Sequence, residues 1–117
     1  MIYNKILIVN DKKYNVYSTS DKVERKQGLM WLESIPNDWG ILFNYDNPDY
    51  YGIWMKNTKI PLDIIWIDEH NRIVDIKTLN PNTETASYPK TKCKYILEVN
   101  ANTFNGKIGE IISLENL

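Results

Sequence analysis

Short runs of β-branched and aromatic residues, separated by turn-forming residues, most limit what this sequence can fold into. Such runs favour β-strands because these side chains pack well on a pleated, half-buried surface. The first two runs, 5–10 and 13–18, flank the pair Asn10-Asp11, which tolerates positive φ, and this arrangement predicts a β-hairpin. Further strands are predicted at 40–44, 52–56, 62–68, 72–78, 93–99 and 109–115.

A helical pattern follows the hairpin. Asp21 offers a side-chain oxygen to the free amides of a helix start, and Glu24 follows it at capping-box spacing. Gly28 costs a helix about 1 kcal/mol relative to Ala, so it marks either the helix end or a close approach of another backbone. Apolar residues among charged ones predict one short amphipathic helix over 21–32, with Val23, Leu29, Met30 and Leu32.

Two segments between predicted strands differ in character. Asp68-Glu69-His70-Asn71 is short and suits a tight turn, because Asp and Asn bond their own backbone. Residues 79–92 form a long polar stretch, and loops of that length are often functional or mobile. The whole pattern predicts an α+β, mostly β fold. We expect a small, partly closed β-barrel or sandwich with one short helix after the first hairpin.

Length and composition indicate one ordinary globular domain, 1–117. The 117 residues are 43% apolar and 25% charged, with a net charge of −1. That charge gives no general attraction to nucleic acid or to anionic lipid, and the short run Lys90, Lys92 and Lys94 is typical of a solvated face. No apolar stretch approaches the ~20 residues of a membrane span. We therefore expect neither a membrane nor a nucleic acid as partner.

The lone Cys93 excludes an internal disulfide, and the N-terminus has no secretory signal pattern, so we expect a cytoplasmic protein. One His and one Cys cannot build a zinc site, and no glycine-rich phosphate loop occurs, so no metal or cofactor is expected. Cys93 is interpreted as a small buried hydrophobe and His70 as a solvated turn residue. The sequence does not determine the oligomeric state.

Asp63 is the first candidate site residue, because it stands inside an otherwise apolar strand. An isolated buried carboxylate is costly, so Asp63 needs water, a cation or backbone amides. Arg25 and Lys56 are the candidate cations. In the structural interpretation, amides of the turn at 57–61 bond Asp63 and hold that turn rigid.

The functional interpretation makes the same region a ligand site. Trp54 supplies a flat stacking wall, Lys56 and Arg25 supply positive charge, and Asn57 supplies paired hydrogen bonds. Residue types alone favour the structural interpretation over the ligand site.

Several sequence blocks occur in a recognisable order. Residues 25–30 read Arg-Lys-Gln-Gly-Leu-Met, and the Trp-Met-Lys-Asn-Thr block at 54–58 is followed by Ile-Pro-Leu-Asp at 60–63. Gly-Ile-Leu-Phe lies at 40–43, and Leu-Glu-Val-Asn-Ala lies at 97–101. In these blocks, from about residue 13 to the C-terminus, the chain resembles the family catalogued as domain of unknown function 192.

The resemblance implies a compact β-rich α+β fold, and it implies no activity or cofactor. Asn102 stands where the family has Gly, which predicts a positive φ there. Polar residues shared with the family motifs exceed what packing alone requires. They are Arg25, Lys56, Asn57, Thr58, Asp63 and Glu98.

Three functions remain open at this point. The leading one is binding of a small polar or sugar-like ligand by Arg25, Trp54, Lys56, Asn57, Thr58, Asp63 and Glu98. The second is an enzyme in which Asp63 or Glu98 acts as general base beside Lys56. The third is a structural or protein-interaction module that uses exposed aromatics such as Trp39, Tyr50 and Tyr51.

Overall fold

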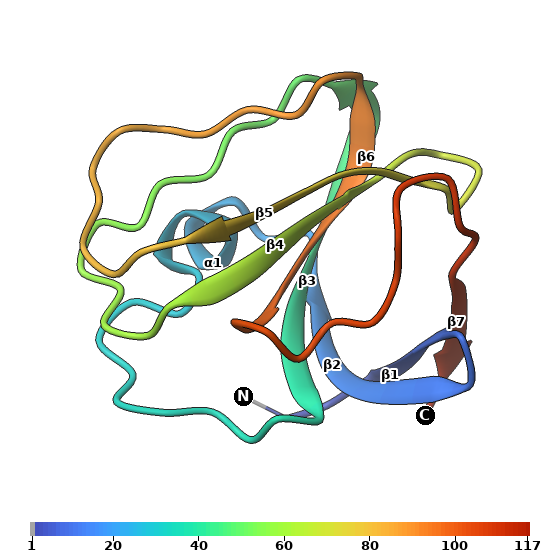
Figure 1. Ribbon diagram of the computed structural model, residues 1–117, viewed down its shortest axis with the longest axis horizontal. Coiled ribbons are helices and arrows are strands. Elements are labelled where there is room, and N and C mark those ends of the chain that lie inside the picture. The colour runs from blue at the N-terminus through green and yellow to red at the C-terminus, as the bar shows by residue number, and fades with distance from the viewer. Residues whose placement is uncertain (1) are drawn as a thin grey trace.

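The computed structural model describes residues 2–117, which form a seven-stranded sheet and one short helix (Figure 1). The helix α1 spans Lys22–Gln27 and follows the first hairpin. The α+β, mostly β prediction is therefore confirmed. The strands are β1 (Lys5–Val9), β2 (Lys12–Thr19), β3 (Trp39–Asp49), β4 (Leu62–Ile67), β5 (Ile73–Leu79), β6 (Cys93–Asn100) and β7 (Ser113–Asn116).

The strand order in the sheet is β5-β4-β6-β3-β2-β1-β7. Neighbouring strands are antiparallel except β2 and β3, which are parallel. A parallel pair needs a crossover connection, and α1 lies in that connection. The edge strands β5 and β7 do not pair, so the sheet is not a closed barrel. The segments just before these two strands meet through a bridge between Arg72 and Ile111 with flanking backbone bonds.

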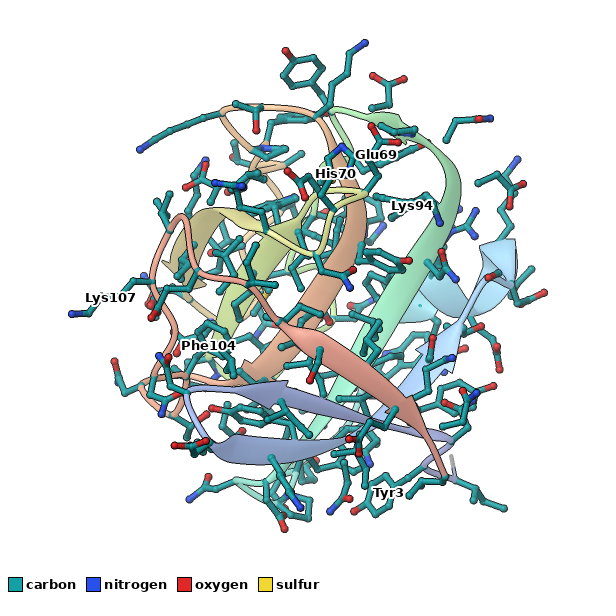
Figure 2. All side chains as sticks on the ribbon, turned by 90° about the vertical axis from the view of Figure 1, so that its right-hand side faces the viewer. Tyr3, Glu69, His70, Lys94, Phe104 and Lys107 are labelled. Carbon is teal, nitrogen blue, oxygen red and sulfur yellow. The ribbon has the colours of Figure 1, made fainter. Side chains whose placement is uncertain are left out.

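Both faces of the sheet carry a buried core, because successive strand residues point to opposite faces. On β4, the fully buried strand, Ile64 and Trp66 join one apolar cluster while Ile65 and Ile67 join the other. The second cluster extends under the loop that joins β6 to β7. There, Figure 2 shows Phe104 beside the β1–β2 hairpin, with its ring 5.9 Å from that of Tyr14. A strand buried on both faces explains the nearly continuous apolar sequence of β4.

The two predicted tight turns are confirmed. Asn10 and Asp11 adopt φ values of 50° and 63°, which closes the β1–β2 hairpin. In the β4–β5 turn, Oδ1 of Asp68 accepts bonds from the amides of His70 and Arg72, each at 2.9 Å. Local side-chain chemistry therefore determines both turns.

The helix begins as predicted but is shorter. Asp21 caps it by accepting a bond from the amide of Glu24 at 2.9 Å, whereas the Glu24 carboxylate bonds Tyr17 and Thr19 instead of completing a capping box. The helix ends at Gly28, whose φ of 50° a helix cannot continue. The amphipathic interpretation is wrong, since α1 buries none of its residues.

The predicted strand at 52–56 is also wrong. Its backbone pairs with the long polar loop rather than with the sheet, through an isolated bridge between Ile53 and Ser87 and a bond from Met55 N to Thr83 O. Figure 1 shows these two segments (green and orange) running side by side on the same side of the molecule as α1. The predicted strand at 109–115 is shorter, at Ser113–Asn116, and that at 40–44 is longer, at Trp39–Asp49. Within residues 2–117, no helix is long and apolar enough to cross a membrane.

Candidate functional site

A cavity of about 310 Å³ lies between the end of α1, the paired loops and the sheet. The segment after β3 and the loop before β6 form its outer walls, held together by the Ile53–Ser87 bridge. Gly52 allows this packing, because a Cβ there would lie 2.5 Å from Cε1 of Tyr88. The lining residues are Arg25, Lys26, Gln27, Gly28, Leu29, Met30, Tyr45, Gly52, Ile53, Trp54, Thr58, Ala86, Tyr88 and Glu98.

Glu98 supplies the carboxyl group of this cavity. It lies on the inner strand β6, opposite Ile41 of β3 and Ile64 of β4, and its side chain is only 4% exposed. Within residues 2–117 this carboxyl group forms no ion pair. No fully buried side-chain oxygen there lacks a hydrogen-bond partner, so the unbonded Glu98 oxygens remain open to the cavity. Burial without a charged partner raises the pKa of Glu98 to about 8. The group is therefore mostly protonated at neutral pH.

Gly28 brings the backbone after α1 close to Glu98. A Cβ at Gly28 would lie 3.4 Å from Oε1 of Glu98 and 3.4 Å from the Phe43 ring. The positive φ of Gly28 also turns the chain away from the helix at this point. One glycine thus ends α1 and keeps the backbone close to the carboxyl group.

Arg25 is fixed in the cavity wall. Its Nη1 donates to the carbonyls of Ser20 and Asn44, and its guanidinium carbon lies 4.6 Å from the ring centroid of Tyr45. The Tyr45 ring in turn stacks on Tyr51, with centroids 3.6 Å apart. Burial raises the pKa of Tyr45 to about 12, so its hydroxyl stays protonated. The wall therefore holds a fixed positive charge and a neutral phenol beside Glu98.

The family of this chain follows from comparison with protein-family models. Residues 5–110 match the model of domain of unknown function 192 (DUF192), a family described as uncharacterised ACR proteins. The chain belongs to this family. Among curated proteins, none matches the sequence.

Two solved structures share the DUF192 chain's fold. A protein of unknown function from Novosphingobium aromaticivorans DSM 12444 has 24% identity and a TM-score of 0.85, covering 94% of this chain and 83% of its own. A proposed transcription regulator from Sinorhizobium meliloti 1021 has 28% identity and a TM-score of 0.86, covering 99% of this chain and 96% of its own. Neither description assigns a ligand.

The structure brings together only some of the DUF192 motif residues singled out in the sequence. Arg25, Trp54, Thr58 and Glu98 line the cavity, whereas Lys56 and Asn57 do not. The ammonium of Lys56 lies 5.3 Å from the Trp54 ring centroid. Asn57 adopts a φ of 56°, and its carbonyl accepts a bond from the amide of Trp31. Those two residues shape the loop next to the cavity.

Asp63 lies outside the cavity and is fully engaged. It is 5% exposed, and its carboxylate accepts bonds from the Thr78 hydroxyl at 2.6 Å and the Asn102 amide at 2.9 Å. The predicted backbone-amide partner is confirmed, but the amide belongs to Asn102 and not to the turn at 57–61, and neither predicted cation pairs with Asp63 within residues 2–117. Asn102 has a φ of 65°, which confirms the positive φ predicted there. Through the Asn102 amide, Asp63 anchors the loop after β6.

Other residues named from the sequence are structural. Cys93 is buried, and its Sγ lies 3.5 Å from the carbonyl of Asp49. Burial raises the pKa of its thiol to about 11. Both observations agree with its interpretation as a small buried hydrophobe. Of the three aromatics considered for a partner surface, Trp39 is buried, Tyr51 is half-buried and only Tyr50 is exposed. In the described part of the chain, no cluster of three or more His, Cys, Asp or Glu side chains is placed to hold a metal ion.

Proposed function

We propose that this chain binds a small polar ligand, with sugars among the candidates, in the cavity beside Gly28 and Glu98. The observation that carries the proposal is the Glu98 carboxyl group, which is buried at the cavity without a partner in residues 2–117. The Glu98 oxygens face the cavity, where a ligand can supply the hydrogen-bond partner that the described residues do not. The lining of this cavity combines aromatic and aliphatic side chains with several polar ones, and convergent polar groups fix the orientation of a ligand in a small-molecule site.

The aromatic lining supports the same proposal. Tyr45, Trp54 and Tyr88 contribute flat surfaces, and Thr58 and Arg25 contribute polar groups. Aromatic faces bind the apolar faces of rings, while the polar groups orient the bound molecule. The volume of about 310 Å³ lies at the small end of the range for such sites.

Ligand-observed NMR with a library of sugars, amino acids, amines and carboxylic acids tests the proposal. Wild type and Asn57→Gly should bind the same library members, because Asn57 lies outside the cavity and Gly keeps its positive φ. Trp54→Ala should weaken binding about tenfold by removing one wall. The proposal is wrong if wild type binds nothing, or if all three proteins bind equally.

A second function, acid–base catalysis by Glu98, is supported by the position of its carboxyl group at the cavity, together with the burial that raises its pKa to about 8. A carboxyl group with a pKa near neutrality both donates and accepts protons efficiently at physiological pH. Lys56, which the sequence placed beside the general base, takes no part in this function because it lies outside the cavity lining. Time-resolved NMR of each bound library member should then show conversion by wild type and at least a 100-fold slower reaction with Glu98→Gln. Unchanged spectra for every bound compound argue against catalysis.

The transcription role named for the Sinorhizobium protein is not extended to this chain. A net charge of −1 provides no general electrostatic attraction to DNA, and that attraction supplies most of non-specific DNA affinity.

A further inference from the structure

The cavity carries one carboxyl group and two cationic side chains that do not pair with it. Glu98 lies at its inner wall, and Arg25 and Lys26 line it from α1. Neither cation forms an ion pair with Glu98 in the described chain. Arg25 is instead held by two carbonyls and the Tyr45 ring, so it does not swing inward to meet the carboxyl group.

The residues packed around Glu98 provide no ionic partner for its carboxyl group, so that partner has to come from a bound molecule. The strands beside it place Ile41 and Ile64 opposite it, and the turn after α1 places Gly28 against it. The titratable or charged groups on the cavity wall are Arg25, Lys26, Tyr45 and Tyr88. A buried carboxylate is stabilised by a cation that also donates hydrogen bonds.

Resting on the proposed function, we propose that the ligand is a zwitterion of amino-acid type, with its protonated amine on Glu98 and its carboxylate facing Arg25. A simple cation would meet unfavourable charge at Arg25 and Lys26, and a simple anion would leave Glu98 without a partner. A zwitterion offers an amine to Glu98 and a carboxylate to Arg25, so both charged groups of the ligand find a partner. Its side chain then lies among Tyr45, Trp54 and Tyr88.

Binding should be coupled to loss of a proton from Glu98. In the free protein the carboxyl group is mostly protonated below a pKa of about 8. A bound ammonium favours the carboxylate form, and the proton passes to solvent. The affinity should therefore rise about tenfold from pH 6 to pH 7 and level off above pH 8.

The test uses probes matched in shape. L-phenylalanine carries both charges, phenethylamine only the amine, and 3-phenylpropanoate only the carboxylate. L-serine, L-leucine and L-glutamine vary the side chain, and D-glucose is the uncharged reference. Calorimetry and NMR titration at pH 6, 7 and 8 measure the affinities. At least one amino acid should bind roughly 10- to 100-fold more tightly than its singly charged analogues, the range expected for a charge-assisted hydrogen bond.

Glu98→Gln should remove both the preference for the zwitterion and the rise in affinity with pH. Glu33→Gln makes the same chemical change on the surface, where Glu33 pairs with Lys59, and should bind like wild type. Thermal unfolding of each variant separates lost binding from lost folding.

The possible outcomes distinguish the two proposals. If D-glucose or other neutral library members bind in the cavity while every amino acid fails, the cavity is a ligand site and the zwitterion inference is wrong. Equal binding of phenethylamine and L-phenylalanine also overturns the inference, because Arg25 then contributes nothing. If no probe or library member binds, the proposed function itself is wrong.

Discussion

Replacing Glu98 by Gln should make the folded protein more stable, and by an amount that depends on pH. Gln keeps the size of the side chain and its ability to form hydrogen bonds but removes the titrating group. Glu98 is 4% exposed and lies between Ile41 and Ile64, so its charged form is strongly disfavoured in the folded state. The substitution removes this cost without opening a void.

The magnitude follows from the two pKa values of Glu98. Burial raises the pKa to about 8 in the folded state, whereas the ordinary value of 4.5 holds in the unfolded chain. Between these values the unfolded chain loses its proton while the folded protein keeps it. Stability therefore falls as the pH rises, by up to about 1.4 kcal/mol per pH unit. Wild type should lose about 3 kcal/mol between pH 4.5 and pH 7, and about 4 kcal/mol between pH 4.5 and pH 9.

Urea unfolding followed by tryptophan fluorescence measures this effect at pH 4, 5.5, 7 and 9. Glu98→Gln and wild type should have nearly equal stability at pH 4, with the variant about 3 kcal/mol more stable at pH 7. For 117 residues that difference corresponds to a rise in Tm of about 12 °C. Glu33→Gln, a surface control, should differ from wild type by less than about 1 kcal/mol at every pH.

Other titrating groups are common to both proteins, so the difference between them isolates Glu98. A difference that stays constant from pH 4 to pH 9 would refute the reasoning, because it would mean that Glu98 does not titrate abnormally. A variant less stable than wild type at pH 7 would show that the carboxylate has a favourable partner in the folded chain.

Two further predictions concern groups outside the cavity. Asp63→Asn should lose about 1–3 kcal/mol in urea unfolding, because one accepting oxygen that faces Thr78 or Asn102 becomes a donor; a loss below about 0.5 kcal/mol would contradict the importance of these bonds. Cys93 should react with a thiol-specific disulfide reagent only on the time scale of unfolding, because it is buried with a pKa of about 11; complete labelling of the native protein within seconds would contradict this.

Local chemistry explains what the sequence predicted well. The turns at Asn10-Asp11 and Asp68–Asn71 depend on side chains that bond nearby backbone, and both occur where they were predicted. The helix start at Asp21 depends on the same kind of contact. The helix was predicted too long because three of the apolar residues counted toward it, Leu29, Met30 and Leu32, lie beyond Gly28. Leu29 reaches the core from a turn, whereas Val23, inside α1, is exposed.

Long-range pairing explains what the sequence did not reveal. Residues 52–56 have strand-like composition, but their backbone partners lie in the polar loop some thirty residues later, and no local pattern indicates that pairing. The same pairing builds the cavity wall from Trp54 and Tyr88. Tyr45 and Tyr88 were therefore missed as lining residues, while Lys56 and Asn57, next to Trp54 in sequence, were wrongly grouped with it.

The two buried carboxyl groups show which kind of residue points to function. Asp63 on β4 and Glu98 on the adjacent β6 are almost equally buried, and sequence reasoning concentrated on Asp63 because its strand is more apolar. Asp63 has two donors and holds a loop, so the fold alone accounts for it. Glu98 has no donor in residues 2–117 and weakens the fold above pH 4.5. A residue that lowers stability and opens onto a cavity is better explained by what enters that cavity than by packing.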